Sequence, residues 1–359
     1  ILILPSSARS SVIRSGADQL GYIYLPEFYA DFENPKGARC SDDVRKELIK
    51  LKAQHVDGII MDLRNNGGGS LYDVVQMVGL FINGGPIVQV RDREGKPQIF
   101  YDRDTSVVYD GPLVVMVNEF SASASEIFAA AIQDYNRGII LGSTSTFGKG
   151  TVQRNIGLDK VMGFIEANND LGTIKLTLQK FYRINGGSTQ LKGVASDINL
   201  PDVYEYSKLR EKDTPEALPW DEISKASYTP WKYKLDWAPI QRASEERIRS
   251  GTAFATIRDN AKWIADQDDK VYSLNLKKFT EENKKVRAAV KQIESAVKLK
   301  KEVDLVALPE DLDRLAYDSG KLERFKDWLK NLRTDIYLDE SVNVMNDLIK
   351  QQSVVYNLH

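Results

Sequence analysis

The chain has 359 residues, of which 42% are hydrophobic and 28% are charged, and its formal net charge is −2. This composition is typical of a globular protein with a hydrophobic core, and the length allows two domains. The small net charge argues against a nucleic acid or an anionic membrane surface as the partner. The sequence contains no apolar run of about eighteen residues, so it predicts no membrane-spanning helix.

The scarcity of cysteine and histidine excludes several kinds of site. The single cysteine, Cys40, rules out an intrachain disulfide and a metal site built from several cysteines. The two histidines are His55, at the end of a charged stretch, and the terminal His359. A Ser-His-Asp triad therefore lacks a well-placed base, and a histidine-rich metal site lacks ligands. We expect no metal and no cofactor.

In the first half of the chain, short apolar runs alternate with glycine turns and helical patterns. We expect helices at 41–54 and 71–81, and strands at 21–24, 58–63, 87–90, 114–117 and 138–141. The run at 58–63 is almost continuously apolar, as in a strand that is buried on both faces. The repeated order of strand, glycine turn and helix predicts an α/β core with a largely parallel sheet.

The second half of the chain changes from strand patterns to helical patterns. Alternation at 173–184 predicts a half-exposed strand, and the Asn-Gly-Gly-Ser turn at 185–188 predicts a hairpin into 189–194. From about residue 204, prolines and tryptophans give way to Lys/Glu-rich helices, expected at 240–267, 275–303, 319–333 and 339–352. We therefore expect an α/β core over residues 1–203 and a helical extension over 204–359.

The most unusual stretch, residues 121–153, holds candidates for a nucleophile and a base. Ser121, Ser123 and Ser125 alternate with alanine at the start of an apolar helical pattern. Spacing alone does not choose among them, because serine is also a common helix cap. Lys149 lies between two glycines, a pattern that, taken alone, also fits a surface turn with a solvated lysine.

A lysine can act as a base only when burial lowers its pKa from about 10.4 toward about 7–8. If residues 149–153 are extended, Lys149, Thr151 and Gln153 share one face, and Gln153 can orient the amine without adding charge. A phosphate-binding loop is excluded, because Ser143 stands where its first glycine is required and Gly150 stands where its Ser or Thr is required.

A glycine turn, Gly67-Gly68-Gly69, follows the buried strand expected at 58–63. Such a turn exposes backbone N–H groups, as an oxyanion hole requires, and the residue after the nucleophile can supply a second amide. The turn does not fit a dinucleotide-binding fingerprint, because Tyr72 stands at the third glycine position. Tight backbone packing is the alternative reason for these glycines.

Four blocks in chain order resemble the tail-specific, or C-terminal-processing, family of serine peptidases. They are the Asp-Leu-Arg-Asn-Asn-Gly-Gly-Gly stretch at 62–69, the Ser-Ala-Ser-Ala-Ser-Glu-Ile run at 121–127, Thr-Phe-Gly-Lys-Gly-Thr-Val-Gln at 146–153, and a later block at 181–194. The resemblance covers about residues 21–203 and implies a core of the crotonase and Clp-protease type. The tail resembles, less distinctively, the helical extension of the larger periplasmic members.

The resemblance assigns roles to particular residues. It makes Ser123 the nucleophile, Lys149 the general base and Gln153 the residue that orients the base. The other implied groups are oxyanion-hole donors and supporting side chains: the amide of Ala124, one amide from Gly68 or Gly69, and the side chains of Glu126, Asp134 and Thr146.

The activity implied by the resemblance is hydrolysis of proteins near nonpolar C-termini through an acyl-enzyme on Ser123, in a bacterial periplasm or cell envelope. The peptide is expected to bind as an added strand. Family members carry a PDZ domain before the core, and we expect this chain to lack one because too few residues precede Ser41. In an assembled dyad, Ser123 Oγ and Lys149 Nζ should lie about 3 Å apart, and a much larger gap indicates a resting form.

Two other functions fit part of the pattern. A catalytically silent binding or scaffold fragment would use its charged helices to dock an adaptor protein or another protomer. An acyl-CoA enzyme of the crotonase type shares a glycine-built oxyanion hole, but it leaves Ser123 and Lys149 without a role.

Overall fold

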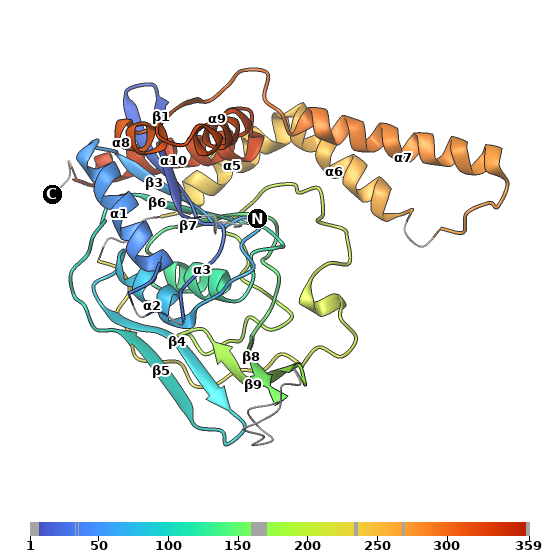
Figure 1. Ribbon diagram of the computed structural model, residues 1–359. Helices are drawn as coiled ribbons and strands as arrows, with labels where there is room; N and C mark the ends of the chain where they lie inside the picture. The colour runs from blue at the N-terminus through green and yellow to red at the C-terminus, as the bar shows by residue number, and fades with distance from the viewer. Residues whose placement is uncertain are drawn as a thin grey trace.

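A mostly parallel sheet organises the structure, a computed structural model that describes residues 7–32, 34, 36–158, 171–232, 236–267 and 270–356, with side chains to 352. Within these residues the sheet has seven strands, in the order β10-β7-β6-β3-β2-β1-β11 (Figure 1). Their bounds are β10 (Ile198–Asn199), β7 (Ile139–Gly142), β6 (Leu113–Val117), β3 (Gly58–Asp62), β2 (Asp18–Tyr24), β1 (Arg9–Ser15) and β11 (Asp304–Val306). Strands β10 to β2 are parallel, and β1 and β11 add antiparallel. The predicted α/β core is confirmed.

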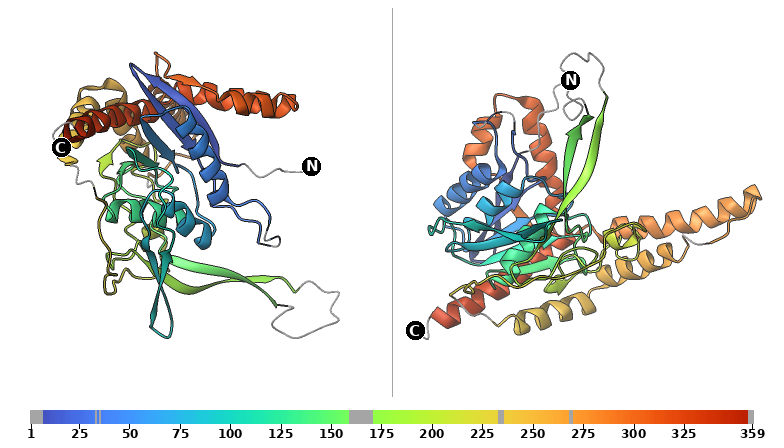
Figure 2. Two further views of the ribbon diagram at one scale, coloured as in Figure 1. Left: turned by 90° about the vertical axis from the view of Figure 1, so that its left-hand side faces the viewer. Right: turned by 90° about the horizontal axis from the view of Figure 1, so that it is seen from below.

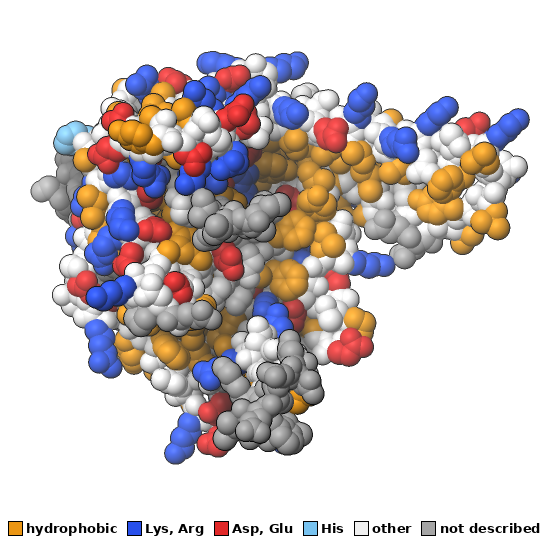
Figure 3. All heavy atoms as spheres, viewed as in Figure 1, with side chains coloured by type: hydrophobic (Ala, Val, Ile, Leu, Met, Phe, Trp, Pro, Cys, Tyr) orange, Lys and Arg blue, Asp and Glu red, His pale blue; other side chains and the backbone are white. Residues whose placement is uncertain are grey.

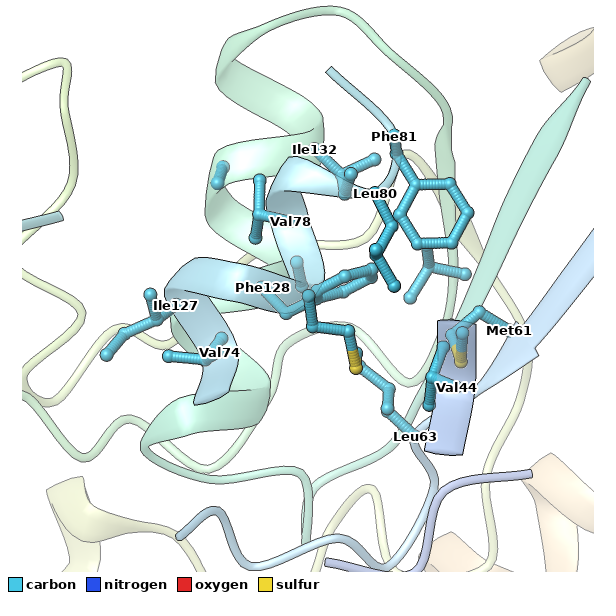
Figure 4. Close-up of a cluster of buried hydrophobic side chains, with 14 of the residues drawn as sticks. Val44, Met61, Leu63, Val74, Val78, Leu80, Phe81, Ile127, Phe128 and Ile132 are labelled. Atoms are coloured by element: carbon cyan, nitrogen blue, oxygen red, sulfur yellow. The ribbon is translucent and has the colours of Figure 1, made fainter. Parts of the chain in front are cut away.

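Both faces of this sheet are covered by helices, which explains the continuous apolar runs of its central strands. On β3, Ile59 and Met61 pack with helices α1 (Cys40–Ala53), α2 (Leu71–Gly79) and α3 (Ala124–Asp134). Figure 4 shows this cluster, with Met61 and Leu63 close to side chains of α1, α2 and α3. Ile60 points to the opposite face and joins a second core with the C-terminal helices. Alternate side chains of one strand therefore serve two different hydrophobic cores.

A second, antiparallel sheet lies beyond the helices α2 and α3 (Figure 1). Its strand order is β5 (Pro97–Asp102), β4 (Gly85–Asp92), β9 (Thr173–Tyr182) and β8 (Thr151–Gly157), so β8 lies at one edge. The register shifts between Val152 and Gln153, as in a β-bulge. Strands β8 and β9 form a ribbon that extends away from the body of the molecule (Figure 2).

The C-terminal half is mostly helical and packs on the first sheet. It contains the 3₁₀ helix η1 (Glu211–Asp213) and helices α5 (Ala238–Ser250), α6 (Thr252–Ala265), α7 (Leu276–Ala296), α8 (Pro309–Leu315), α9 (Ser319–Arg333) and α10 (Ile336–Tyr356). Helices α6 and α7 form an arm that extends from the body, and apolar side chains lie exposed along it (Figures 1 and 3). Among the described residues, no helix combines the length and apolar character needed to span a bilayer.

Three secondary-structure predictions are wrong, each for a local reason. The helix predicted at 240–267 is two helices, because Gly251 takes an extended conformation between them. The helix predicted at 275–303 ends at Ala296, and the short strand β11 follows at 304–306. No strand forms at 189–194, because Leu191 and Gly193 have positive φ angles of 63° and 66° and the segment turns to bond the loop that holds Lys149.

The exposure of β9 also differs from the expectation. Alternation predicted one buried face, yet Ile174, Leu176 and Leu178 are 43%, 43% and 41% exposed. Strand β9 is paired with β8 along most of its length, but no helix packs on this part of the ribbon among the described elements. The alternating pattern therefore marks a two-sided ribbon and not the surface of a core.

Candidate active site

The three alternating serines differ in burial and hydrogen bonding. Ser121 is fully buried, and its Oγ accepts from the Asn118 amide (2.9 Å) and donates to the Leu63 carbonyl oxygen (2.8 Å). Ser125 is also fully buried and donates to the carbonyl oxygen of Asn66 (2.8 Å). Ser123 alone of the three is partly exposed. The geometry therefore gives Ser121 and Ser125 structural roles and supports Ser123 as the candidate nucleophile.

Ser123 has a strained backbone at the N-terminus of α3. Its φ of 57° and ψ of −110° lie in a region where residues other than glycine rarely occur. The turn follows β6 and meets the glycine turn, since a Cβ on Gly68 would lie 2.7 Å from the Ser123 Cβ and 3.0 Å from the Ala124 nitrogen. Only a residue without a side chain allows these two turns to approach so closely.

The backbone amides beside Ser123 suit an oxyanion hole. The Gly68 amide already donates to the Asn66 side chain (2.9 Å), so it is occupied. Among the described residues, the amides of Gly69 and Ala124 have no hydrogen-bond partner. Gly69 forms a parallel bridge with Phe28, in which Gly68 and Ser70 make the hydrogen bonds, so the Gly69 amide points away from Phe28. The pair Gly69 and Ala124 is thus better suited to bind an oxyanion than the pair with Gly68.

Glu126 ties the candidate nucleophile to the candidate base. Its carboxylate is fully buried and accepts four hydrogen bonds: from the Ser123 amide (2.8 Å), Thr146 Oγ1 (2.6 Å), the Gly148 amide (2.7 Å) and the Lys149 amide (2.9 Å). The Ser123 and Lys149 amides donate to the same oxygen, Oε2. Burial raises the pKa of this carboxyl group to about 7, although the four donors oppose the rise.

Lys149 is half-buried at the base of the β8–β9 ribbon. Its Nζ donates to Gln153 Oε1 (3.1 Å), and Gln153 donates in turn to Thr177 Oγ1 of β9 (3.2 Å). Burial lowers the pKa of Lys149, the neighbouring Lys175 lowers it further, and the carboxylates of Glu211 and Glu126 raise it. The direction of the net change is the one that a general base needs.

The Ser123 hydroxyl and the Lys149 amine are not hydrogen-bonded to each other among the contacts of the described residues. The contact expected of an assembled dyad is therefore not made in this conformation. The backbones of the two residues are held together by Glu126, whereas the amine is directed along β8 toward Gln153.

Of the remaining predicted supporting residues, one joins the site and one does not. Thr146 is buried and links Glu126 to the Val194 amide, which donates to Thr146 Oγ1 (2.7 Å). Asp134 lies at the other end of α3, about 16 Å from Ser123 along the helix axis. There it accepts two hydrogen bonds from Arg183 (2.5 and 3.1 Å), so it anchors the end of β9.

Sequence reasoning missed two residues that build the site. Asn66 is fully buried, and its carbonyl oxygen accepts from the Ala122 amide (3.0 Å) and from Ser125, which joins the glycine turn to the serine turn. Gln190 is also fully buried and accepts from the Gly150 amide (2.8 Å). Both lie in the blocks that carried the family resemblance, but nothing in their spacing indicated these contacts.

Among the described residues, no group of three or more His, Cys, Asp or Glu side chains is placed so that it could hold a metal ion.

Comparisons with known proteins agree with the sequence blocks. Residues 19–200 match the model of peptidase family S41, and residues 204–350 match that of the C-terminal domain of tail specific protease. A tail-specific protease of Haemophilus influenzae is 45% identical over 228 residues, which cover 64% of this chain and 31% of that protein. A carboxy-terminal-processing protease of Bartonella bacilliformis is 35% identical over 191 residues, 52% of this chain and 40% of that protein.

Among solved structures, the photosystem II D1 C-terminal processing protease has a TM-score of 0.46 and 27% identity, covering 55% of this chain and 49% of that chain. The chain spans well under half the length of the curated relatives given above.

Proposed function

The chain belongs to peptidase family S41, and we propose that it is a serine endopeptidase that hydrolyses proteins near nonpolar C-termini. In this proposal Ser123 is the nucleophile, Lys149 is the general base and Gln153 orients the base. The observation that carries the proposal is the single carboxylate oxygen of Glu126 that accepts from both the Ser123 and the Lys149 amides. These buried hydrogen bonds hold residues 146–150, here called the base loop, beside the turn that presents Ser123.

The first half of the reaction forms an acyl-enzyme. Neutral Lys149 accepts the Ser123 hydroxyl proton while Oγ attacks the carbonyl carbon of the scissile peptide bond. The negative charge that develops on the carbonyl oxygen is stabilised by the amides of Gly69 and Ala124. Lys149 then donates its proton to the leaving amine, the C–N bond breaks, and the acyl group remains on Ser123.

The second half releases the acyl group. A water molecule loses a proton to Lys149 and attacks the ester carbonyl carbon, again through an oxyanion at the same two amides. The ester bond breaks and the proton returns from Lys149 to Ser123 Oγ. Between these steps the amine can return to its hydrogen bond with Gln153.

We propose that the substrate binds as a strand along β8. This strand lies at the edge of its sheet, where unpaired backbone groups can accept an extended peptide. Lys149 lies two residues before β8 and Gln153 lies on it, so a peptide paired here passes beside the base. The preference for nonpolar C-termini and the location in a bacterial periplasm or cell envelope rest on the family resemblance.

The test is cleavage of a protein that carries a nonpolar C-terminal tail. We expect Ser123→Ala and Lys149→Ala to abolish cleavage, while the exposed controls Ser106→Ala and Lys96→Ala cleave like the wild type. A substrate that differs only in an acidic tail should be cleaved more slowly. Wild-type turnover in either site variant would contradict the assignment.

The missing hydrogen bond between Ser123 and Lys149 favours a second candidate function. In this alternative the chain is a catalytically silent fragment that docks an adaptor protein or another protomer through its helical extension. The α6–α7 arm has apolar residues for such a contact, among them Val271 and Leu274, which are 92% and 105% exposed. Stoichiometric acylation of Ser123 by a fluorophosphonate contradicts this alternative, whereas an unlabelled chain that sediments as a dimer supports it.

A further inference from the structure

The segment 204–213, which lies beyond the matched peptidase region, packs against the loop that carries Lys149. The Glu211 amide donates to the carbonyl oxygen of Phe147 (3.0 Å), two residues before the lysine. On the other side of the same loop, Glu205 accepts from Thr144 Oγ1 (2.5 Å) and pairs with Arg210 (3.2 Å), which is 4% exposed. The segment is thus anchored at two points of the loop.

The side chain of Glu211 is connected through Gln190 to Gly150, the residue that follows Lys149. Its Oε1 accepts from Gln190 Nε2 (3.1 Å), and Gln190 Oε1 accepts from the Gly150 amide (2.8 Å). The carboxylate fixes which end of the Gln190 amide faces Gly150, because a carboxylate can only accept and a backbone amide can only donate. A carboxylate in the C-terminal extension therefore sets the orientation of a fully buried side chain beside the base.

Glu126 and Glu211 hold the base loop from opposite sides. Glu126, from α3, accepts the amides of Gly148 and Lys149. Glu211 holds the flanking positions, directly at Phe147 and through Gln190 at Gly150. Four consecutive residues, 147–150, thus have backbone groups held from two sequence regions. The Glu126 carboxylate accepts two of these amides, the Glu211 amide donates to Phe147, and Gln190 connects Gly150 to the Glu211 carboxylate.

The charge of Glu211 also acts on the amine without pairing with it. No salt bridge joins Glu211 to Lys149 among the described residues, so the amine stays available to Gln153 and Ser123. The charged groups that act on the amine are Lys175 from β9, Glu211 from η1 and Glu126 from α3. The two carboxylates stabilise the ammonium form, and Lys175 destabilises it.

We infer that Glu211 is a positioning residue of the peptidase reaction, which holds the Lys149 loop through its amide and through Gln190, so that the C-terminal extension completes the active site. This inference rests on the proposed function. It predicts that the extension influences the chemistry of the base and not only the stability of the fold.

The experiment compares Glu211→Gln and Glu211→Ala with Glu216→Gln, an exposed glutamate of the same connector, in the full chain. Glu211→Gln keeps an acceptor for Gln190 but removes the charge, so the acidic limb of kcat/KM should move to lower pH with a small loss of rate. Glu211→Ala also removes the acceptor, so kcat should fall roughly tenfold to a hundredfold with little change in KM. Glu216→Gln should match the wild type.

The outcomes separate this inference from the proposed function. A shifted pH limb in Glu211→Gln, with kcat partly retained relative to Glu211→Ala, supports the positioning role. If the wild type cleaves and both Glu211 variants keep its kcat/KM and pH profile, the inference is overturned alone. If the wild type neither cleaves nor labels at Ser123, the proposed function and this inference both fail.

Discussion

The proposed nucleophile and the proposed base lie in two very different surroundings. Ser123 begins a helix whose residues 124–132 are all buried, and its strained backbone is locked between the glycine turn and the core. Lys149 lies at the base of a projecting ribbon, and its amine is held by Gln153, which is exposed. Packing thus fixes the serine in advance, whereas a few polar contacts set the position of the lysine. Adjustment of the site on substrate binding is expected on the lysine side.

The contrast depends on Glu126, which joins the two sides, so its removal should have the largest effect. Glu126→Ala leaves two buried and two partly buried donors without an acceptor, and we expect the free energy of unfolding to fall by about 3 kcal/mol. The kcat/KM value should fall by about 100-fold or more because the base loop is released. Urea unfolding and steady-state kinetics measure these effects, with Glu216→Ala as the exposed control. A Glu126→Ala variant with wild-type stability would show that the four hydrogen bonds to Glu126 do not stabilise the fold.

The buried carboxyl also predicts a pH dependence of stability. Because the folded-state pKa of Glu126 is raised from 4.5 to about 7, the folded protein binds this proton more readily than the unfolded chain. The stabilisation that this bound proton adds to the free energy of unfolding is therefore fully present below about pH 4.5 and is lost as the pH rises to about 7. Glu126→Gln lacks this loss, so its unfolding free energy relative to the wild type should increase between pH 5 and pH 8, as measured by urea titration. A difference that does not change with pH would contradict the raised pKa.

The rigid side of the site can be broken at Gly69. A Cβ there would lie 2.2 Å from the Phe28 carbonyl oxygen, at a φ of 141°. Gly69→Ala should displace the oxyanion amide and lower kcat by roughly 100-fold to 1,000-fold with little change in KM. Gly67→Ala is the matched control, because a Cβ on Gly67 meets nothing within 4 Å. Equal kinetics in the two variants would remove Gly69 from the oxyanion hole.

The adjustable side of the site can be tuned at Lys175. Because this neighbouring charge lowers the Lys149 pKa, Lys175→Gln should raise that pKa and move the acidic limb of kcat/KM to higher pH. The shift is opposite to the one expected for Glu211→Gln. It should shrink at high salt, since Lys175 is exposed. A pH–rate series with Lys96→Gln as control measures it, and no shift at low salt would contradict this description of the base.

Much of the fold could be predicted from sequence, because it depends on local patterns. The apolar run at 58–63 and the glycine turn after it indicate a strand buried by layers on both faces, which the structure confirms. Strand β1 gave no such signal, since Arg9, Ser10 and Ser11 are polar, although Ser10 and Ser11 are buried. Strand β11 has three residues and follows a lysine-rich stretch, so its pairing with β1 is set by tertiary structure.

The candidate site was less predictable, because its contacts join distant segments. Spacing could not choose among the three serines, and the choice of Ser123 came from the family resemblance. The hydrogen bonds of Ser121 to Leu63 and of Ser125 to Asn66, about sixty residues away in the chain, supply the physical reason. Glu211 lies in an irregular connector, where composition gives no indication of a contact with the base loop.

The smallest expected effect concerns the strain at Ser123. A glycine adopts its φ of 57° without steric cost, so Ser123→Gly should be more stable than Ser123→Ala by about 1 kcal/mol. Both variants lack the proposed nucleophile, so the comparison separates backbone strain from chemistry. Denaturant unfolding of the two proteins measures the difference, and a more stable alanine variant would show that the backbone is relaxed.

The rate at which a fluorophosphonate acylates Ser123, measured against pH, tests the central claim most directly. If Lys149 is the base, the wild type labels at one site per chain, and its rate rises with pH through a lysine pKa that burial has lowered. Lys149→Ala should then label far more slowly and without that rise, and Ser123→Ala should not label. Labelling of Lys149→Ala at the wild-type rate across the pH range would contradict the Ser-Lys mechanism.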